Sequence, residues 1–206
     1  MTDTNRLGCT AAILALWFPG LASAQSAAPA AKAEEQKPPA AMEVPKPAAE
    51  LDQLKVMAGD WICEGTMPAG AMGPGSPAQK IRSTMKVKKS MDGFWYTMEY
   101  AEKKTKDHPV AIKAHGPMGY DSAQKKFIMF GVDNMGGYMT ETSPGWEGDK
   151  MVMTGDGTMM GQKASVRDTI TRKGDKEFVW ASDMKMGGAP DFVPMGEQHC
   201  KKAAGK

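Results

Sequence analysis

Hydrophobic and polar residues alternate with a period of two along most of this chain. In the clearest stretch, Ile81, Ser83, Met85 and Val87 alternate with lysine, arginine and threonine. This alternation is typical of a β-strand that has one buried and one solvent-exposed face. The pattern recurs and predicts about ten strands, at 61–66, 80–88, 94–100, 110–115, 127–132, 138–142, 151–154, 163–172, 177–184 and 197–201.

The segments between these strands are short and contain residues that favour tight turns. The turn signals are Asp92-Gly93, Gly119-Tyr120-Asp121, Asp133-Asn134, Gly148-Asp149, Gly155-Asp156-Gly157 and Gly174-Asp175. Short connections join antiparallel neighbours, and a meander of this kind loses its exposed edges when it closes. We therefore predict an all-β protein, an up-and-down antiparallel barrel with longer loops at 67–77 and 186–194.

The first 24 residues have the features of a secretory signal peptide. Arg6 precedes an apolar run at 10–18, and Ala22-Ser23-Ala24 supplies the small residues that precede a cleavage site. The apolar run is too short to span a bilayer, and no later stretch approaches the required length of about 18 residues. We expect a periplasmic or secreted mature protein without a transmembrane segment.

A tether and a short helix are predicted between the signal peptide and the first strand. Residues 25–49 are mostly alanine, proline, lysine and glutamate and include no aromatic residue, a composition typical of disordered segments. Leu51, Leu54 and either Met57 or Ala58 then recur at helical spacing, and Gly59 ends this pattern, so residues 50–58 are predicted to form a helix. The barrel domain is expected to cover residues 50–202, and 203–206 to form a flexible tail.

The charge of the chain is close to balance, at +2 for 206 residues. Cleavage of the predicted signal peptide would remove one basic residue and one acidic residue and leave this value unchanged. Such a chain lacks the strongly basic character of nucleic-acid-binding proteins, and we expect no nucleic-acid partner. The pattern leaves the oligomeric state open.

Two of the three cysteines lie in the first and the last predicted strands. Cys9 belongs to the predicted signal peptide, and Cys63 and Cys200 remain after its removal. An even number of cysteines in an oxidising compartment favours a disulfide. If the barrel closes, the first and last strands become neighbours, so we predict a Cys63–Cys200 bridge; two buried, unpaired thiols are the alternative.

The start of the predicted barrel is similar to that of a known superfamily. A short helix followed by Gly59-Asp60-Trp61 resembles the entry to the calycin barrels, the lipocalin superfamily, in which a Gly-x-Trp plugs the closed end. The resemblance implies that Gly59 and Trp61 form the plug. It also implies a basic residue from the last strand stacked on the tryptophan, where this chain has Lys201 or Lys202.

Several shorter motifs resemble one bacterial family in particular, domain-of-unknown-function family 1579. They are residues 54–61, Asp92-Gly93-Phe94, the run 116–121 with Lys126-Phe127, and the late strand with Trp180. The resemblance covers about residues 50–202. It implies a barrel with an interior cavity, and it implies no reaction.

Methionine is unusually frequent, at 19 of 206 residues. Thioethers fill irregular apolar space, and they are also ligands of Cu(I). Met151 with Met153, and Met184 with Met186, have the spacing of a pair on one strand face. Because the methionines are spread over most strands, we interpret them as core filler or cavity lining and keep copper as an alternative.

Haem is the second cofactor that the pattern raises. Related barrels bind haem iron through one histidine on a late strand, and His199 has that position. Successive side chains of a strand point to opposite faces, so an inward Cys200 turns His199 to solvent. We therefore expect no cofactor, with haem and Cu(I) as the alternatives.

Catalytic motifs are weak in this sequence. Glu99, Asp168 and Asp183 lie within predicted strands without an adjacent nucleophile or metal cluster, and we expect most of them to face outward. Ser122-Ala123-Gln124-Lys125 fits the Ser-x-x-Lys pattern but has no companion motif. The sequence favours a protein that is not an enzyme.

The leading hypothesis is an exported barrel that binds a small apolar or amphipathic molecule in its interior. Two alternatives are an enzyme that uses cavity carboxylates such as Glu99 and an envelope interaction domain held on the tether. The residues expected to line the cavity, chosen by strand parity, are Met85, Val87, Tyr96, Met98, Met129, Val166, Phe178 and Trp180.

Overall fold

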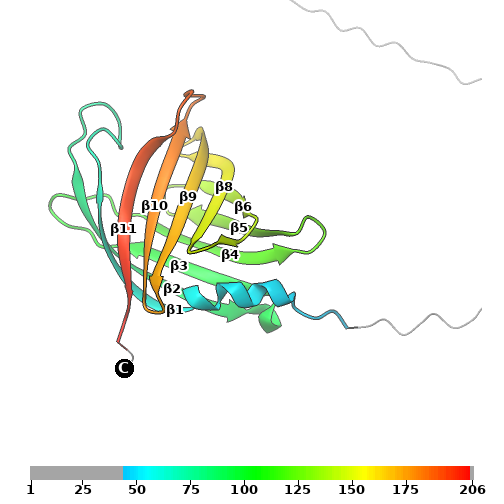
Figure 1. Ribbon diagram of the computed structural model, residues 1–206. Coiled ribbons are helices and arrows are strands. Elements are labelled where there is room, and N and C mark those ends of the chain that lie inside the picture. The colour runs from blue at the N-terminus through cyan, green and yellow to red at the C-terminus, as the bar shows by residue number, and fades with distance from the viewer. Residues whose placement is uncertain (1–43, 205–206) are drawn as a thin grey trace, which may run out of the picture. The chain divides into compact units, whose positions relative to one another are not determined.

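The computed structural model describes residues 44–204, which form one β-rich unit (Figure 1). The predicted signal peptide, residues 25–43 of the predicted tether and residues 205–206 lie outside the described residues. Two 3-10 helices are present, η1 (Ala49–Met57) and η2 (Met91–Gly93). The strands are β1 (Gly59–Met67), β2 (Gln79–Ser90), β3 (Trp95–Glu102), β4 (Lys113–Asp121), β5 (Lys126–Asp133), β6 (Tyr138–Ser143), β7 (Trp146–Glu147), β8 (Lys150–Met159), β9 (Gln162–Gly174), β10 (Glu177–Met186) and β11 (Val193–Lys202).

Ten of these strands close into an antiparallel barrel. Each strand from β1 to β6 pairs with the next, β6 pairs with β8, and β8 to β11 continue in order until β11 pairs with β1. The two-residue strand β7 pairs only with β8 and lies outside the closed circuit. The predicted up-and-down barrel is therefore confirmed, with one additional short strand.

A disulfide bond crosses the seam where the barrel closes. Cys63 of β1 lies directly opposite Cys200 of β11, and their sulfur atoms are bonded. Both side chains are buried, at 1% and 0% exposure, and they pack with Trp61 and Phe178 in the main core. The predicted bridge is confirmed, and it joins residues that are 137 positions apart.

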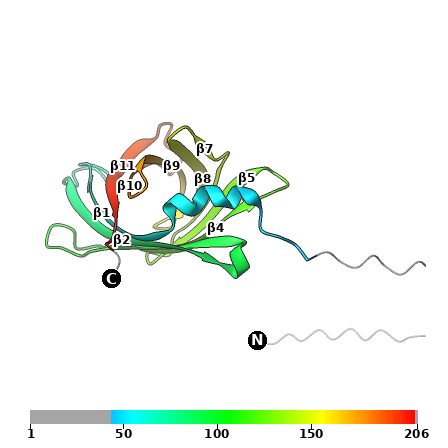
Figure 2. The same cartoon turned by 60° about the horizontal axis from the view of Figure 1, so that its bottom comes forward.

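Helix η1 lies across one end of the barrel (Figure 2). Leu51, Leu54 and Met57 are buried against the core, as their spacing predicts. The Trp146 indole N–H donates a hydrogen bond of 3.1 Å to the Gln53 carbonyl oxygen and joins η1 to β7. This end of the barrel is thereby closed by side chains. No helix within residues 44–204 has the length and apolar character needed to cross a bilayer.

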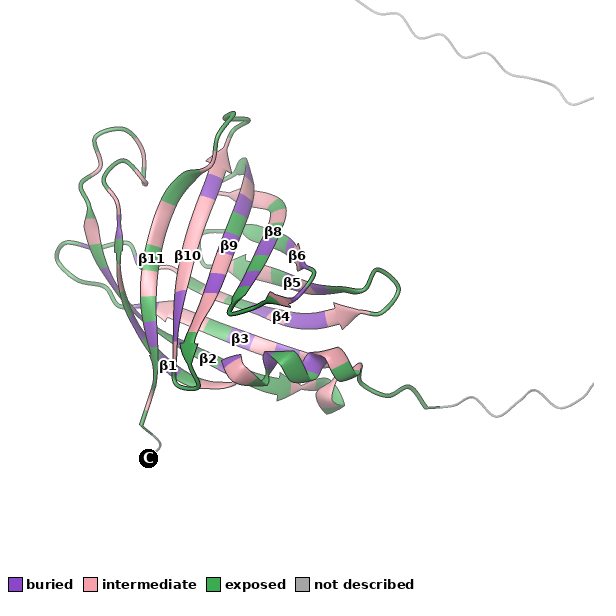
Figure 3. Ribbon diagram, viewed as in Figure 1, coloured by how far each residue is buried: buried purple, intermediate pink, exposed green. Residues whose placement is uncertain are grey.

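Burial alternates along the strands, as the sequence pattern predicts (Figure 3). In β2, Ile81, Ser83, Met85 and Val87 are buried and the residues between them are exposed. The largest group of buried side chains surrounds η1, and a smaller group forms around Ala164, Val166 and Met184. The two ends of the barrel are therefore packed differently.

Two of the expected turns lie within strands instead. Residues 119–121 end β4, and the turn follows at 122–125, where Asp121 Oδ1 accepts hydrogen bonds from the backbone N–H groups of Ala123 and Gln124 at 2.9 and 3.1 Å. Strand β4 also begins at Lys113 instead of residue 110. The predicted turn exists, and aspartate caps it from its first position. The turn lies three residues later in the chain than the sequence predicted.

Gly155-Asp156-Gly157 lies inside β8, and its interpretation as a turn was wrong. A Cβ atom at Gly155 would collide with the Thr140 carbonyl oxygen, and one at Gly157 would collide with the Tyr138 carbonyl oxygen. The two glycines therefore permit the close approach of β6 to β8, where the strand order skips β7. Their role is to shape the barrel wall.

Candidate functional site

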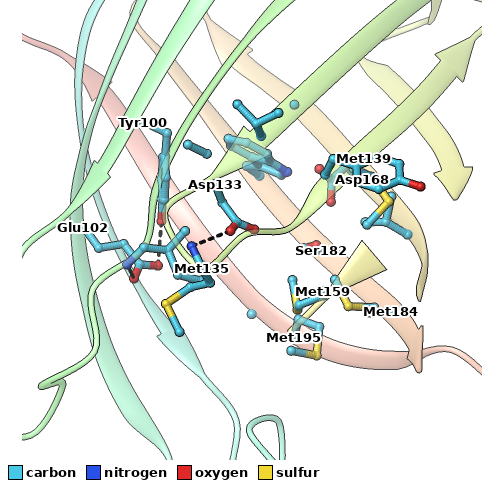
Figure 4. A pocket seen from close by; sticks show the side chains of 18 of the residues that line it. Tyr100, Glu102, Asp133, Met135, Met139, Met159, Asp168, Ser182, Met184 and Met195 are labelled. Carbon is cyan, nitrogen blue, oxygen red and sulfur yellow. Dashed lines mark hydrogen bonds between the residues drawn. The ribbon is translucent and has the colours of Figure 1, made fainter. Parts of the chain in front are cut away.

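A cavity of about 240 Å³ opens at the end of the barrel away from η1. Its lining comes from the ends of β1, β3, β5, β8 and β10, from the starts of the other barrel strands, and from the loops between them. Ten of the lining residues are methionines: Met67, Met72, Met98, Met129, Met135, Met139, Met159, Met160, Met184 and Met195. Figure 4 shows several of these side chains around the space. The open end is thus a methionine-lined cavity.

The eight residues expected to line a cavity divide into two groups along the barrel axis. Met98, Met129, Val166 and Trp180 border the cavity. The other four pack in the main core near η1 and do not border it: Met85, Val87, Tyr96 and Phe178. All eight come from strand positions of the expected parity, but that parity does not give their height in the barrel.

Two of the four acidic residues that line the cavity already have partners. Glu102 accepts hydrogen bonds from the Tyr100 hydroxyl at 3.0 Å and the Ile112 backbone N–H at 2.8 Å, and its Oε2 lies 2.8 Å from His108 Nε2. Asp133 Oδ1 accepts hydrogen bonds from the backbone N–H groups of Met135 and Gly137, and it holds the β5–β6 turn. The local structure therefore provides hydrogen-bond partners for both carboxylates.

Glu141 of β6 and Asp168 of β9 are different. Their side chains are buried, at 3% and 5% exposure. Glu141 Oε2 and Asp168 Oδ1 have no hydrogen-bond partner among the described residues, and neither does Nε1 of the neighbouring Trp180. A buried carboxyl oxygen without a partner is costly, because it has lost water and gained no donor. The interior of the cavity therefore holds two buried acids, each with one carboxyl oxygen that lacks a hydrogen-bond partner.

The pKa values of both carboxyls are raised. Burial is the largest cause for Glu141, and the nearby charge of Asp168 raises its pKa further. Burial also raises the pKa of Asp168; the adjacent Ser182 hydroxyl and Trp180 indole offset part of this rise, and Asp183 adds to it. The pair therefore holds protons more tightly than exposed carboxylates do.

The pairing of the barrel strands shows which residues lie next to Glu141 and Asp168. Glu141 lies opposite Met129 of β5 and Gly155 of β8, and Asp168 lies opposite Met153 of β8 and Ser182 of β10. Strand β8 thus separates the two acids, and Gly155 contributes no side chain between them. Figure 4 shows Asp168 together with Ser182 and Met139 at the cavity.

The structure places Asp168 inside the barrel and Glu99 outside it. Asp168 faces inward, because it shares strand parity with the buried Val166 and Ile170. Glu99, which the enzyme hypothesis placed in the cavity, is exposed and forms an ion pair with Lys88 at 3.6 Å. Glu141 was not singled out at all, since its neighbours in β6 are mostly threonine and serine and give no apolar signal.

The residues of the closed end lie together as the calycin resemblance implies. The Trp61 indole N–H donates a hydrogen bond of 2.7 Å to the Met57 carbonyl oxygen, and Lys202 Nζ lies 5.4 Å from the centre of the Trp61 ring. Of the two candidate lysines, Lys202 is therefore the one that lies over the tryptophan ring. Gly59 has a φ of 129°, and the Lys202 side chain crosses the space that a Cβ would need. Their role as a plug stays a prediction.

The histidines and the methionine pairs do not lie together at one site. His199 is exposed and lies 3.3 Å from Glu197, His115 is exposed, and His108 is buried beside Glu102. Met151 and Met153 are buried in the core, whereas Met184 borders the cavity with Met159 and Met195. Residues 44–204 contain no group of three or more histidine, cysteine, aspartate or glutamate side chains with the arrangement of a metal site.

Comparison with known proteins places the barrel in a family. The model of a family described as "Protein of unknown function (DUF1579)" matches residues 46–196, which include η1 and nearly all of the barrel. No curated protein matches the chain. The chain therefore belongs to the DUF1579 family.

Proposed function

We propose that this protein binds a small amphipathic molecule in the methionine-lined cavity at the open end of the barrel. The observation that carries this proposal is the cavity itself, about 240 Å³ with ten methionines in its wall. Ligand pockets are typically concave, mostly apolar and provided with a few polar groups. This cavity has that composition, and its size suits a ligand smaller than a typical drug molecule.

Methionine suits such a wall because its side chain is flexible and polarisable. It adapts its shape to a guest and makes favourable contacts with aromatic rings through sulfur. Met72, Met135 and Met160 are exposed where the loops and turns surround the mouth, together with Tyr138. Exposed apolar side chains in one place are typical of binding sites. The rim therefore offers an apolar path into the cavity.

Methionine methyl groups also provide the test. In protein labelled with [methyl-¹³C]methionine, NMR titration with hexan-1-ol should shift the methyl signals of cavity residues such as Met139, Met159 and Met184. The signals of Met118 and Met151, which are buried in the closed end, should stay in place. Binding elsewhere, or no shift of the cavity signals at millimolar concentrations, would contradict the proposed site.

An acid–base enzyme is the second candidate, because two buried carboxyls lie in the cavity with further polar groups. Groups with raised pKa values in a pocket are typical of proton-transfer sites. Native mass spectrometry distinguishes the two functions. A carrier and its E141Q/D168N variant, produced in the original host, should retain molecules of the same chemical skeleton. An enzyme should retain an unreacted molecule only in the variant.

We also propose that the protein acts outside the cytoplasm. The buried Cys63–Cys200 disulfide supports this, because such bonds persist in oxidising compartments. The predicted signal peptide supports it independently. Cell fractionation should place the protein in the periplasm or medium, and N-terminal sequencing should begin at Gln25. A cytoplasmic protein that keeps residues 1–24 would refute export.

A further inference from the structure

Among the described residues that line the cavity, the charged side chains are all acidic. Glu102, Asp133, Glu141 and Asp168 are among the described residues that line it, and no lysine, arginine or histidine is. The chain as a whole carries a net charge of +2. Acidic groups are therefore concentrated in this mainly apolar cavity, in a protein that is slightly basic overall.

Glu141 and Asp168 are the two cavity acids that each keep a buried oxygen without a hydrogen-bond partner. The Ser182 hydroxyl and the Trp180 indole offset only part of the raised pKa of Asp168. Glu102 has His108, Tyr100 and Ile112 as partners, and Asp133 holds a turn, as described above. Glu141 and Asp168 are more than nine-tenths buried, and each has one oxygen without a donor. They belong to β6 and β9, which flank β8, where Gly155 lies opposite Glu141 and Met153 lies opposite Asp168. The charge of Asp168 acts on Glu141, so the two carboxyls are close enough to interact.

We propose that the molecule bound in this cavity carries a protonated amine, which donates hydrogen bonds to Glu141 and Asp168 while its apolar part contacts the methionines. This inference rests on the proposed function, because it requires that a small molecule enters the cavity. An ammonium group supplies both features that the pair lacks, a positive charge and several N–H donors.

The remaining polar and aromatic groups fit the same chemistry. The rings of Tyr100, Tyr138 and Trp180 border the cavity, and aromatic faces attract cations. Tyr100 and Gln198 are already linked by a hydrogen bond of 2.9 Å, so they do not satisfy the acid pair. A bare metal ion would leave most of a 240 Å³ space unfilled. An organic cation would compensate the acids and also fill the apolar volume.

The charged neighbours determine how this binding depends on pH. On β10, Asp183 faces away from the cavity, raises the pKa of Asp168 and is paired with Arg167 of β9 at 2.7 Å. The other ionisable side chains among the described residues that line the cavity are Tyr100, Glu102, Asp133 and Tyr138. At low pH the pair is protonated and accepts an ammonium poorly. The affinity for an amine should therefore rise as pH increases from 5 to 8, while that for an alcohol of the same length should not.

Three six-carbon probes test the inference on the full chain, with the methionine methyl signals as readout. Hexylammonium, hexan-1-ol and hexanoate share their apolar part and differ in the polar end. We expect hexylammonium to bind about tenfold or more tightly than hexan-1-ol at pH 7.5, since hydrogen bonds between charged groups are worth about that factor or more. Hexanoate should bind most weakly, because the acid pair and the other acidic residues of the cavity repel its carboxylate.

Variants connect the preference to the two acids. The E141Q/D168N variant should lose the preference for hexylammonium over hexan-1-ol. The matched control E99Q removes an exposed carboxylate of β3 and should keep the preference. Unchanged signals of Met118 and Met151 would show that each variant is folded.

The outcomes separate this inference from the proposed function. If hexan-1-ol binds as tightly as hexylammonium to the unmodified protein, or if E141Q/D168N keeps the preference, the amine inference is wrong and the cavity remains a binding site. If none of the three probes shifts the cavity signals, the proposed binding function itself is wrong.

Discussion

The disulfide across the barrel seam should contribute a large part of the stability of this protein. The test compares the double variant C63A/C200A with a reference protein that keeps the disulfide. Both carry C9A, so that no third thiol competes. Both sulfur atoms are buried in the folded barrel, so substitution is a cleaner change than reduction of the native protein. The hydrogen-bonded pairing of β1 with β11 remains in the variant.

The size of the effect follows from the length of the loop that the bond closes. The two cysteines are 137 positions apart, and a loop of that length restricts the unfolded chain by about 5 kcal/mol in the chain-entropy model. Truncation of two buried side chains adds a smaller loss of packing. Domains of this size are stable by about 5–15 kcal/mol in total, so the variant should lose a third or more of its stability.

Urea denaturation followed by tryptophan fluorescence measures this difference. The variant should unfold at a lower urea concentration and with a steeper dependence on urea, since its unfolded chain exposes more surface. Addition of a reductant should not change the variant further. A loss below about 1 kcal/mol would refute the reasoning, because it would mean that the unfolded chain gains little freedom when the bond is removed.

Three further predictions concern the two ends of the barrel and the wall between them. Burial raises the folded-state pKa values of Glu141 and Asp168, so the stability that their protonated forms contribute is complete below about pH 4 and is lost as pH rises through those values. E141Q/D168N should therefore be more stable than the unmodified protein at pH 8 and similar to it at pH 4, and an equal difference at both pH values in thermal unfolding would contradict this. Gly155→Ala should cost about 1–3 kcal/mol in urea denaturation because its Cβ meets the Thr140 carbonyl oxygen, whereas Gly131→Ala, with open space at that position, should be nearly neutral. Trp61→Phe removes the buried hydrogen bond to Met57 and should cost about 1–3 kcal/mol, and more than Trp146→Phe, whose bond to Gln53 is exposed; equal losses would indicate that the buried indole N–H is unimportant.

The period-two pattern was sufficient to predict the fold. It reports which face of a strand is buried, and short connections then leave antiparallel neighbours as the simple arrangement. The Cys63–Cys200 pairing followed from closure, because first and last strands must meet. The errors at 119–121 and 155–157 share a cause. Glycine and aspartate favour turns, but glycine also allows two strands to approach closely, and a single sequence does not separate these roles.

The candidate site was harder to predict because it depends on height along the barrel axis. Strand parity placed Met98 and Met129 inside together with Met85 and Tyr96, yet only the first two border the cavity. Height depends on the register and tilt of strands that are distant in sequence. Asp168 could have been found from parity, since Val166 and Ile170 flank it at two-residue spacing. Glu141 could not, because Met139 and Ser143 give a mixed pattern.

The two ends of the barrel explain why methionine is so frequent. At the closed end, Met57, Met85, Met118, Met151 and Met153 are packed with η1, and there methionine serves as filler. At the open end, ten methionines surround a space that the protein does not fill. An unfilled cavity and two buried carboxyl oxygens without partners both lower stability. The closed core and the disulfide supply stability at the other end and across the seam. A barrel needed only as a scaffold would gain by filling the cavity and replacing both acids, so their presence in one place supports a binding role for the open end.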